Sequence, residues 1–165
     1  MSMDAGDDLL QRACRVHRIA WNMLGSAAEA EQATQQTLLI TMRFPERASF
    51  DVPVYAVAID VALLRLGPAR CPVAESPDAY RARFDWSDLL DELIERPDLA
   101  ETIRILLQRL DGMDRAAFVL REIEGFSIDE TVDILRIPAD EVRGRVHRAL
   151  VLLTGLLGRK FDTLL

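Results

Sequence analysis

The chain has 165 residues, enough for one domain or two small ones, and half of them are hydrophobic. The net charge of −7 at pH 7 argues against a protein that coats nucleic acid without selectivity. No apolar run approaches the ~20 residues that cross a bilayer, and the N-terminus is acidic, unlike a signal peptide, so the sequence predicts a cytoplasmic protein.

Residue types that carry catalysis or bind metal are scattered along the chain. Cys14 and Cys71 are isolated and form no CxxC pair, and His17 and His147 are equally unpaired. No nucleophile–base set, phosphate-binding glycine loop or catalytic carboxylate pair is recognisable. We therefore expect no enzymatic activity, no metal and no cofactor.

Two helices are predicted at the start of the chain. Residues 7–24 repeat apolar side chains at three- and four-residue steps, and Gly25 ends the pattern. Ser26 with Glu29 forms a capping box for a second helix over residues 27–44. The apolar stripes expected to face the core are Leu10, Ala13, Cys14, His17, Ala20, Trp21 and Leu24 on the first helix, and Ala30, Ala33, Thr37, Leu38, Thr41 and Phe44 on the second.

The next segment, residues 53–66, is apolar nearly all round. Asp60 is its only charge before Arg65, so strand and buried helix compete, and its length with its alanines and leucines favours a buried or interface helix. Three prolines follow within residues 67–77, which predicts a linker over residues 67–97 that includes a short helix at 86–95.

The second half continues with helices over residues 98–110 and 114–123, separated by an Asp-Gly stop. Ser127 and Glu130 then form a capping box for a short helix, which Pro138 ends. A longer helix begins near Asp140. This order is typical of a helix-turn-helix that enters the DNA major groove: a short helix, a tight turn and a longer helix with arginines in its first turns.

Charge is unevenly distributed. Residues 140–160 hold five basic and two acidic side chains, whereas residues 78–101 hold eight acidic and three basic ones. A local basic face is what a site-specific DNA reader needs. A solvated helical hairpin is the simpler reading of the basic stretch, and the acidic stretch is either a solvated face or a cover for the basic helix.

In its order of elements the sequence resembles bacterial sigma factors of the extracytoplasmic-function (ECF) type, most closely over residues 110–127, at Ile137-Pro138 and over residues 142–149. The resemblance implies an all-α fold: a region 2-like domain (1–66), a linker (67–97) and a region 4-like helix-turn-helix domain (98–165). It also implies promoter −35 recognition by the last helix. The DNA-binding residues would be Ser127, Arg143, Gly144, Arg145, His147 and Arg148.

The resemblance also implies partners. Core RNA polymerase would dock on residues 27–44, through Glu31, Gln32, Gln35, Gln36 and Arg43, and an anti-sigma factor would restrain the protein. Two of the acids usual in this helix are amides here, Gln32 and Gln36.

The segment that melts the −10 element in the family departs further from the pattern. Ala56, Ile59 and Asp60 stand where the family has arginines and an asparagine, and single-stranded DNA needs a positive groove with stacking surfaces. Two alternatives therefore remain open. One is a sigma-like module that captures an anti-sigma factor without melting DNA, and the other is a simple helix-turn-helix regulator.

Overall fold

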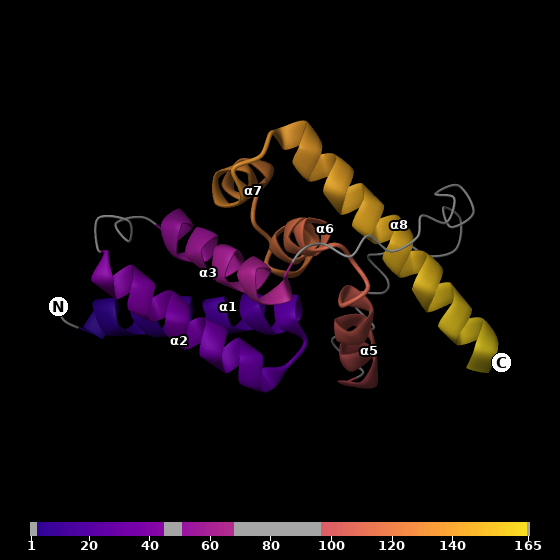
Figure 1. Ribbon diagram of the computed structural model, residues 1–165, viewed down its shortest axis with the longest axis horizontal. Helices are drawn as coiled ribbons and strands as arrows, with labels where there is room; N and C mark the ends of the chain where they lie inside the picture. The colour runs from indigo at the N-terminus through magenta and orange to yellow at the C-terminus, as the bar shows by residue number, and fades with distance from the viewer. Residues whose placement is uncertain (1–2, 45–50, 68–96, 165) are drawn as a thin grey trace.

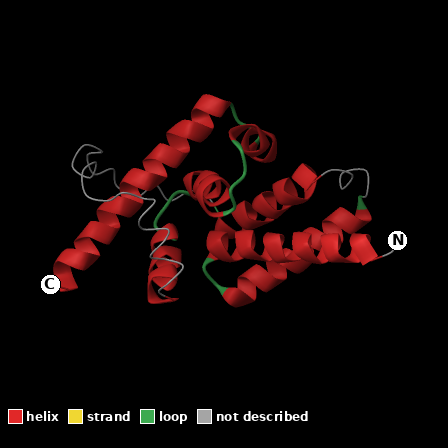
Figure 2. Cartoon of the chain, turned by 180° about the vertical axis from the view of Figure 1, so that it is seen from behind, coloured by secondary structure: helices red, strands yellow, loops and turns green. Residues whose placement is uncertain are grey.

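The computed structural model describes residues 3–44, 51–67 and 97–164, and every regular element there is a helix (Figures 1 and 2). The predicted all-α class is confirmed. The helix expected at 86–95 and most of the expected linker lie outside the described residues. The helices are α1 (Met3–Leu24), α2 (Ala27–Arg43), α3 (Asp51–Leu66), α5 (Pro97–Leu107), α6 (Gly112–Phe118), the π-helix η3 (Val119–Ile123), α7 (Ile128–Leu135) and α8 (Ala139–Leu164).

The first three helices pack on one another. Gly25 makes the turn between α1 and α2 with a φ of 72°, which a residue with a side chain adopts only at a cost. Ser26 caps α2 by accepting the Glu29 amide at 3.4 Å. Ala30, Ala33 and Thr37 of the predicted α2 stripe are buried, whereas Phe44 is half exposed.

The stripe predicted on α1 is partly wrong. Leu10 is 64% exposed and Cys14 is exposed, whereas Val16, Ile19 and Met23 are completely buried. The additional residues are buried because α1 contacts α2 and α3 and also the second half of the chain, so its buried surface extends beyond the predicted stripe.

The long apolar segment forms α3, and the prediction of a buried helix is confirmed. Its buried residues are Val54, Tyr55, Ala56, Ala58, Ile59, Val61 and Ala62. They are covered because α3 lies between α1 and α2 on one side and α6 and α7 on the other (Figure 1).

The Asp-Gly pair at 111–112 begins a helix, so its predicted role as a stop is wrong. Helix α5 ends at Leu107 through shorter-range bonds, such as that from the Leu110 amide to the Leu107 carbonyl at 3.1 Å. Asp111 then caps α6 by accepting the Met113 amide at 3.0 Å.

The helix predicted over 114–123 changes its winding at Val119. There α6 passes into η3, and the Glu124 amide donates to the Val119 carbonyl at 2.9 Å, five residues back. Phe118, Val119 and Leu120 are all completely buried, since this segment runs through the middle of the molecule.

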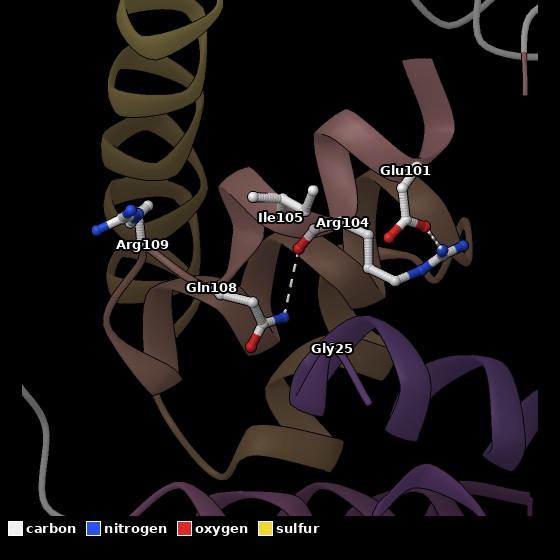
Figure 3. Close-up of a pocket in the computed structure, with 6 residues that line it drawn as sticks. All are labelled: Gly25, Glu101, Arg104, Ile105, Gln108 and Arg109. Atoms are coloured by element: carbon white, nitrogen blue, oxygen red, sulfur yellow. Dashed lines mark hydrogen bonds and ion pairs between the residues drawn. The ribbon is translucent and has the colours of Figure 1, made fainter. Parts of the chain in front are cut away.

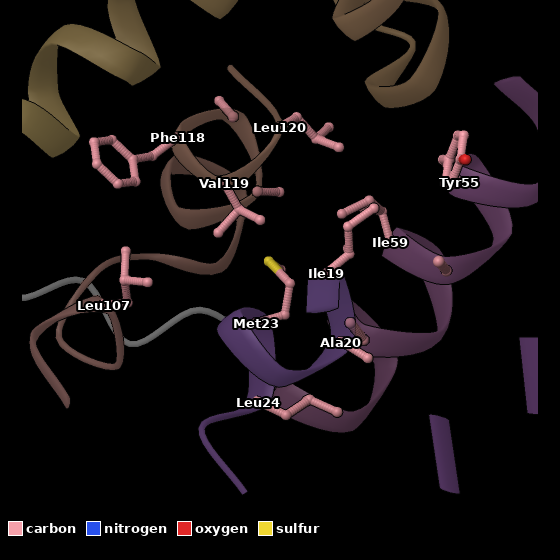
Figure 4. Close-up of a cluster of buried hydrophobic side chains, with 14 of the residues drawn as sticks. Ile19, Ala20, Met23, Leu24, Tyr55, Ile59, Leu107, Phe118, Val119 and Leu120 are labelled. Carbon is pink, nitrogen blue, oxygen red and sulfur yellow. The ribbon is translucent and has the colours of Figure 1, made fainter. Parts of the chain in front are cut away.

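One hydrophobic core spans both halves of the chain. Figure 4 shows Met23 and Ile59 of the first half converging on Leu107 and Val119 of the second. Arg115 lies in this core and donates to the Met23 carbonyl, to Gln108 Oε1 at 2.8 Å and to the Leu110 carbonyl at 2.9 Å. Burial lowers the pKa of Arg115 to about 10, which leaves the guanidinium charged at neutral pH.

A buried carboxylate also joins the two halves. The Glu124 side chain is 1% exposed and accepts from Arg15 Nε at 3.2 Å and from Arg18 Nη2 at 2.9 Å. The Arg15 guanidinium lies over the Phe126 ring, 3.9 Å from its centroid. The hydrogen bond to Glu124 is the main cause that raises the pKa of Arg18 above its usual value.

Candidate nucleic-acid interface

The predicted helix-turn-helix is present as α7, a tight turn and α8. Ser127 Oγ accepts the Glu130 amide at 3.1 Å, and the Glu130 carboxylate accepts the Ser127 amide at 2.7 Å, which completes the predicted capping box. Arg136 ends α7 in the left-handed region with a φ of 57°. The Val142 amide then donates to the Pro138 carbonyl at 3.0 Å in the first turn of α8.

One side of α8 packs on the core, and the other faces outward. Val142, Ala149, Leu153 and Leu157 are completely buried. Four of the predicted DNA-binding residues lie on the exposed surface of the N-terminal half of α8, namely Arg143, Gly144, His147 and Arg148. An added Cβ at Gly144 would have no neighbouring atom within 4 Å, so its backbone is open to close approach.

The cations of α8 differ in their surroundings. Arg143 is 59% exposed and pairs with the fully exposed Asp140 at 2.9 Å, a contact that water and salt weaken. Arg145 is only 21% exposed and bonds Glu141 at 2.7 Å and Asp114 at 2.9 Å. Arg148 donates from Nε and Nη2 to Asp114 at 2.7 and 2.9 Å. The composition of α8 predicts its basic face but not this carboxylate of α6.

Ser127 has a structural role in this arrangement. Its hydroxyl accepts the Glu130 amide, and its carbonyl accepts the Thr131 amide and hydroxyl at 3.0 and 2.7 Å. The residue is exposed, so contact between its surface and DNA stays a prediction.

The residues predicted to dock on core polymerase share the exposed face of α2. Glu31, Gln32, Gln35, Gln36 and Arg43 are all exposed. Arg65 of α3 donates to Gln32 at 3.3 Å and to Gln36 at 3.0 Å, which adds a cation next to the two amides.

An apolar cluster also lies near the end of α2, and the sequence reasoning missed it. Leu39 is 66% exposed, Met42 78% and Phe44 52%. The signal available in the sequence was the large apolar side chains at positions 39 and 42, off the buried stripe.

The segment that the resemblance assigns to DNA melting is covered by the second half. Tyr55, its only aromatic residue, is 4% exposed and packs edge-on against Phe126 with ring centroids 5.1 Å apart. Asp60 accepts Arg136 Nη2 at 2.6 Å, which links α3 to the turn of the helix-turn-helix.

A hollow of about 290 Å³ opens where α5 meets the end of α1 (Figure 3). Part of its polar lining is paired: Arg104 bonds Glu101 at 2.5 Å, and Gln108 donates to the Arg104 carbonyl at 3.4 Å, whereas Arg104 Nε is buried without a hydrogen-bond partner. A single unpaired guanidinium nitrogen is not the convergent set of polar groups that a ligand site needs.

Within the described residues there is no cluster of three or more histidines, cysteines or acids that could hold a metal. None of the helices described is both long enough and apolar enough to cross a bilayer.

Comparison with known proteins gives one consistent answer. SigM, an ECF RNA polymerase sigma factor of Mycobacterium tuberculosis, is 28% identical over 160 residues, covering 93% of this chain and 78% of SigM. SigE of Mycolicibacterium smegmatis is 26% identical and matches 89% of this chain but 59% of its own length. The RNA polymerase sigma-H factor of Pseudomonas aeruginosa is 29% identical over 135 residues, covering 74% of this chain and 70% of sigma-H.

The chain is thus similar to ECF sigma factors over most of its length. The family described as "Response regulator PhyR, sigma-like domain" also matches, over residues 107–151, which run from the end of α5 into α8. A chain from the structure of CnrH in complex with the cytosolic domain of CnrY has the same fold, with a TM-score of 0.64 and 21% identity, covering 93% of this chain and 87% of that one. The predicted all-α class and the resemblance to ECF sigma factors are confirmed, whereas the site residues and domain boundaries stay predictions.

Proposed function

We propose that this chain is a transcription initiation factor that docks on core RNA polymerase through the exposed face of α2 and reads a promoter −35 element through α7 and α8. The observation that carries the proposal is the exposed face of α8, where Arg143, Gly144 and His147 follow a properly capped α7. An arginine in the major groove can hold guanine with two hydrogen bonds, for about 1–3 kcal/mol of discrimination. The homology to ECF sigma factors supports the same role.

Docking of polymerase on α2 has its own support. The face is exposed, and the apolar side chains of Leu39 and Met42 extend it beyond the polar residues. An exposed apolar group beside polar residues is typical of a protein interface. The domain division at residues 67–97 remains part of the proposal, as does the involvement of an anti-sigma factor.

The test of docking is capture of purified core polymerase by the full chain. We expect stable capture, and we expect Glu31→Arg to weaken it at least several-fold, because it reverses the charge of an exposed acid on the docking face of α2. Asp133→Arg makes the same charge change on the exposed surface of α7 and should leave capture unchanged. No capture by the unaltered chain would overturn the initiation-factor function.

The test of promoter reading is a footprint of the polymerase complex on candidate promoters at low salt. Protection around −35 is expected, and Arg143→Gln should remove it. Protection that survives this substitution would show that α8 does not make the deciding contact.

A second function is supported by a different observation. The family matched over residues 107–151 is the sigma-like domain of a response regulator, and α3 offers little for melted DNA, since Tyr55 is buried and Asp60 is acidic. In this function the chain captures an anti-sigma factor and does not open DNA. An abortive transcription assay tests whether the chain melts DNA. If RNA product forms from a premelted template but not from a duplex, the chain does not melt DNA. Capture of a purified anti-sigma factor without capture of core polymerase favours the second function outright.

A further inference from the structure

Asp114 is a buried acid in direct contact with the proposed DNA-reading helix. The residue is 4% exposed and stands in the first turn of α6. Its carboxylate accepts Arg148 Nε at 2.7 Å on Oδ2, and both Arg148 Nη2 and Arg145 Nη1 at 2.9 Å on Oδ1. One carboxylate of α6 therefore holds two of the three arginines in the N-terminal half of α8.

These arginines cannot leave Asp114 without consequence. A buried carboxylate that loses its cations is an uncompensated charge, and DNA phosphates nearby would add repulsion to that cost. Arg143 is in the opposite situation, because its partner Asp140 is 99% exposed and water can replace the contact.

We propose that Asp114 is a positioning residue that withholds Arg145 and Arg148 from phosphates and leaves DNA contact on α8 to Arg143 and His147. The inference rests on the proposed DNA-reading function of α8 and sharpens it. The three arginines of this half-helix pair with four acids, Asp111, Asp114, Asp140 and Glu141, so its effective positive charge is lower than its composition indicates. Asp114 thereby favours sequence-dependent binding over general attraction to phosphate.

The experiment measures binding of the full chain to a promoter duplex and to a scrambled duplex over a range of salt concentrations. Asp114→Asn keeps the shape of the side chain and removes its charge. We expect it to bind the scrambled duplex about three- to ten-fold more tightly, with a log–log salt slope steeper by about 1–2, because each phosphate contact adds about 0.9. The promoter-to-scrambled ratio should fall.

Asp140→Asn is the matched control, since it makes the same change of net charge on the exposed partner of Arg143. Any gain shared by both variants comes from net charge alone, and equal gains would overturn the inference. Arg148→Gln added to Asp114→Asn should lower the slope again by about 0.9, the share of one phosphate contact, which a merely structural effect would not produce.

Two further measurements decide the remaining outcomes. In the otherwise unaltered chain, Arg148→Gln should leave the salt slope almost unchanged, whereas Arg143→Gln should lower it by about 0.9. A larger fall in the slope for Arg148→Gln than for Arg143→Gln would overturn the inference. This comparison holds even if Asp114→Asn fails to fold. If the unaltered chain binds no DNA but Asp114→Asn gains binding, promoter reading fails and the inference stands. If the unaltered chain binds promoter DNA and Asp114→Asn leaves the slope unchanged, the inference fails and promoter reading stands.

Discussion

Arg136 Nη2 bonds both carboxylate oxygens of Asp60, at 2.6 and 2.8 Å, and so ties the turn of the helix-turn-helix to α3. Both side chains are about half exposed. An exposed pair of this kind contributes at most ~1 kcal/mol. The backbone of Arg136 is in the left-handed conformation, with a φ of 57°, which is unfavourable for most residues that have a side chain.

We expect Arg136→Gly to change the free energy of unfolding by no more than about 0.5 kcal/mol, because relief of the backbone offsets loss of the pair. Arg136→Ala loses the pair without that relief and should destabilise the chain by up to about 1 kcal/mol. Urea unfolding measures both, and Asp60→Asn reports the pair alone. A glycine variant less stable than the alanine variant would contradict this account.

Glu124→Gln should destabilise the chain by about 1–3 kcal/mol, because the buried carboxylate is the shared acceptor for Arg15 and Arg18. The cost stays below that of a fully buried broken pair, since these arginines are 31% and 59% exposed and regain water. Thermal unfolding provides the measurement. Glu141→Gln, at an exposed site, should cost less than about 0.5 kcal/mol, and equal costs would argue against the importance of the Glu124 contact.

Gly25→Ala should cost more than Gly125→Ala. Both glycines have positive φ, 72° and 74°, and each alanine pays about 1 kcal/mol for that. At Gly25 the added Cβ would also lie 2.7 Å from Gln108 Cδ, whereas at Gly125 it meets nothing within 4 Å. Displacing Gln108 disturbs its bond with Arg115, for about 1 kcal/mol more. The difference between the two urea midpoints tests this contact between the halves of the chain.

Gly144→Ala should stabilise the chain by about 0.5–1 kcal/mol, because the glycine lies inside α8 and its Cβ position is open. If α8 enters the major groove as proposed, the same substitution should weaken promoter binding, since the methyl group stands where DNA approaches. Thermal unfolding and duplex titration together give the result. Stabilisation with unchanged DNA binding would place the contact surface away from Gly144.

The capping box of α7 should make part of the stability pH-dependent. The Ser127 backbone amide and then its hydroxyl lower the pKa of Glu130. The folded pKa is therefore below the unfolded value of about 4.3, so the stabilisation is present above that pH and is lost as the pH falls through the folded value. Unfolding free energies of the wild type and Glu130→Gln should converge below about pH 4. A difference between the wild type and Glu130→Gln that persists in acid would exclude this origin. Ser127→Ala, which removes the hydroxyl of the capping box, should cost about 1 kcal/mol at neutral pH.

Features that depend on neighbours three or four residues away follow from the amino-acid sequence alone. The capping box of Ser127 and Glu130 is such a feature, because donor and acceptor are placed by the helix itself. The buried nature of α3 follows equally from its composition, since an apolar helix without a polar face has to be covered. The spacing of the basic residues along α8 likewise predicts that Arg143 and His147 lie on its exposed side.

Contacts between residues far apart in the sequence follow only from the packing of the helices. Asp114 lies 31 and 34 residues before Arg145 and Arg148, and no local pattern pairs them. The burial of Val16 depends on how many helices surround α1. The physical reason is common to both: helix geometry places near neighbours along the chain, whereas packing alone determines which distant side chain a buried group meets.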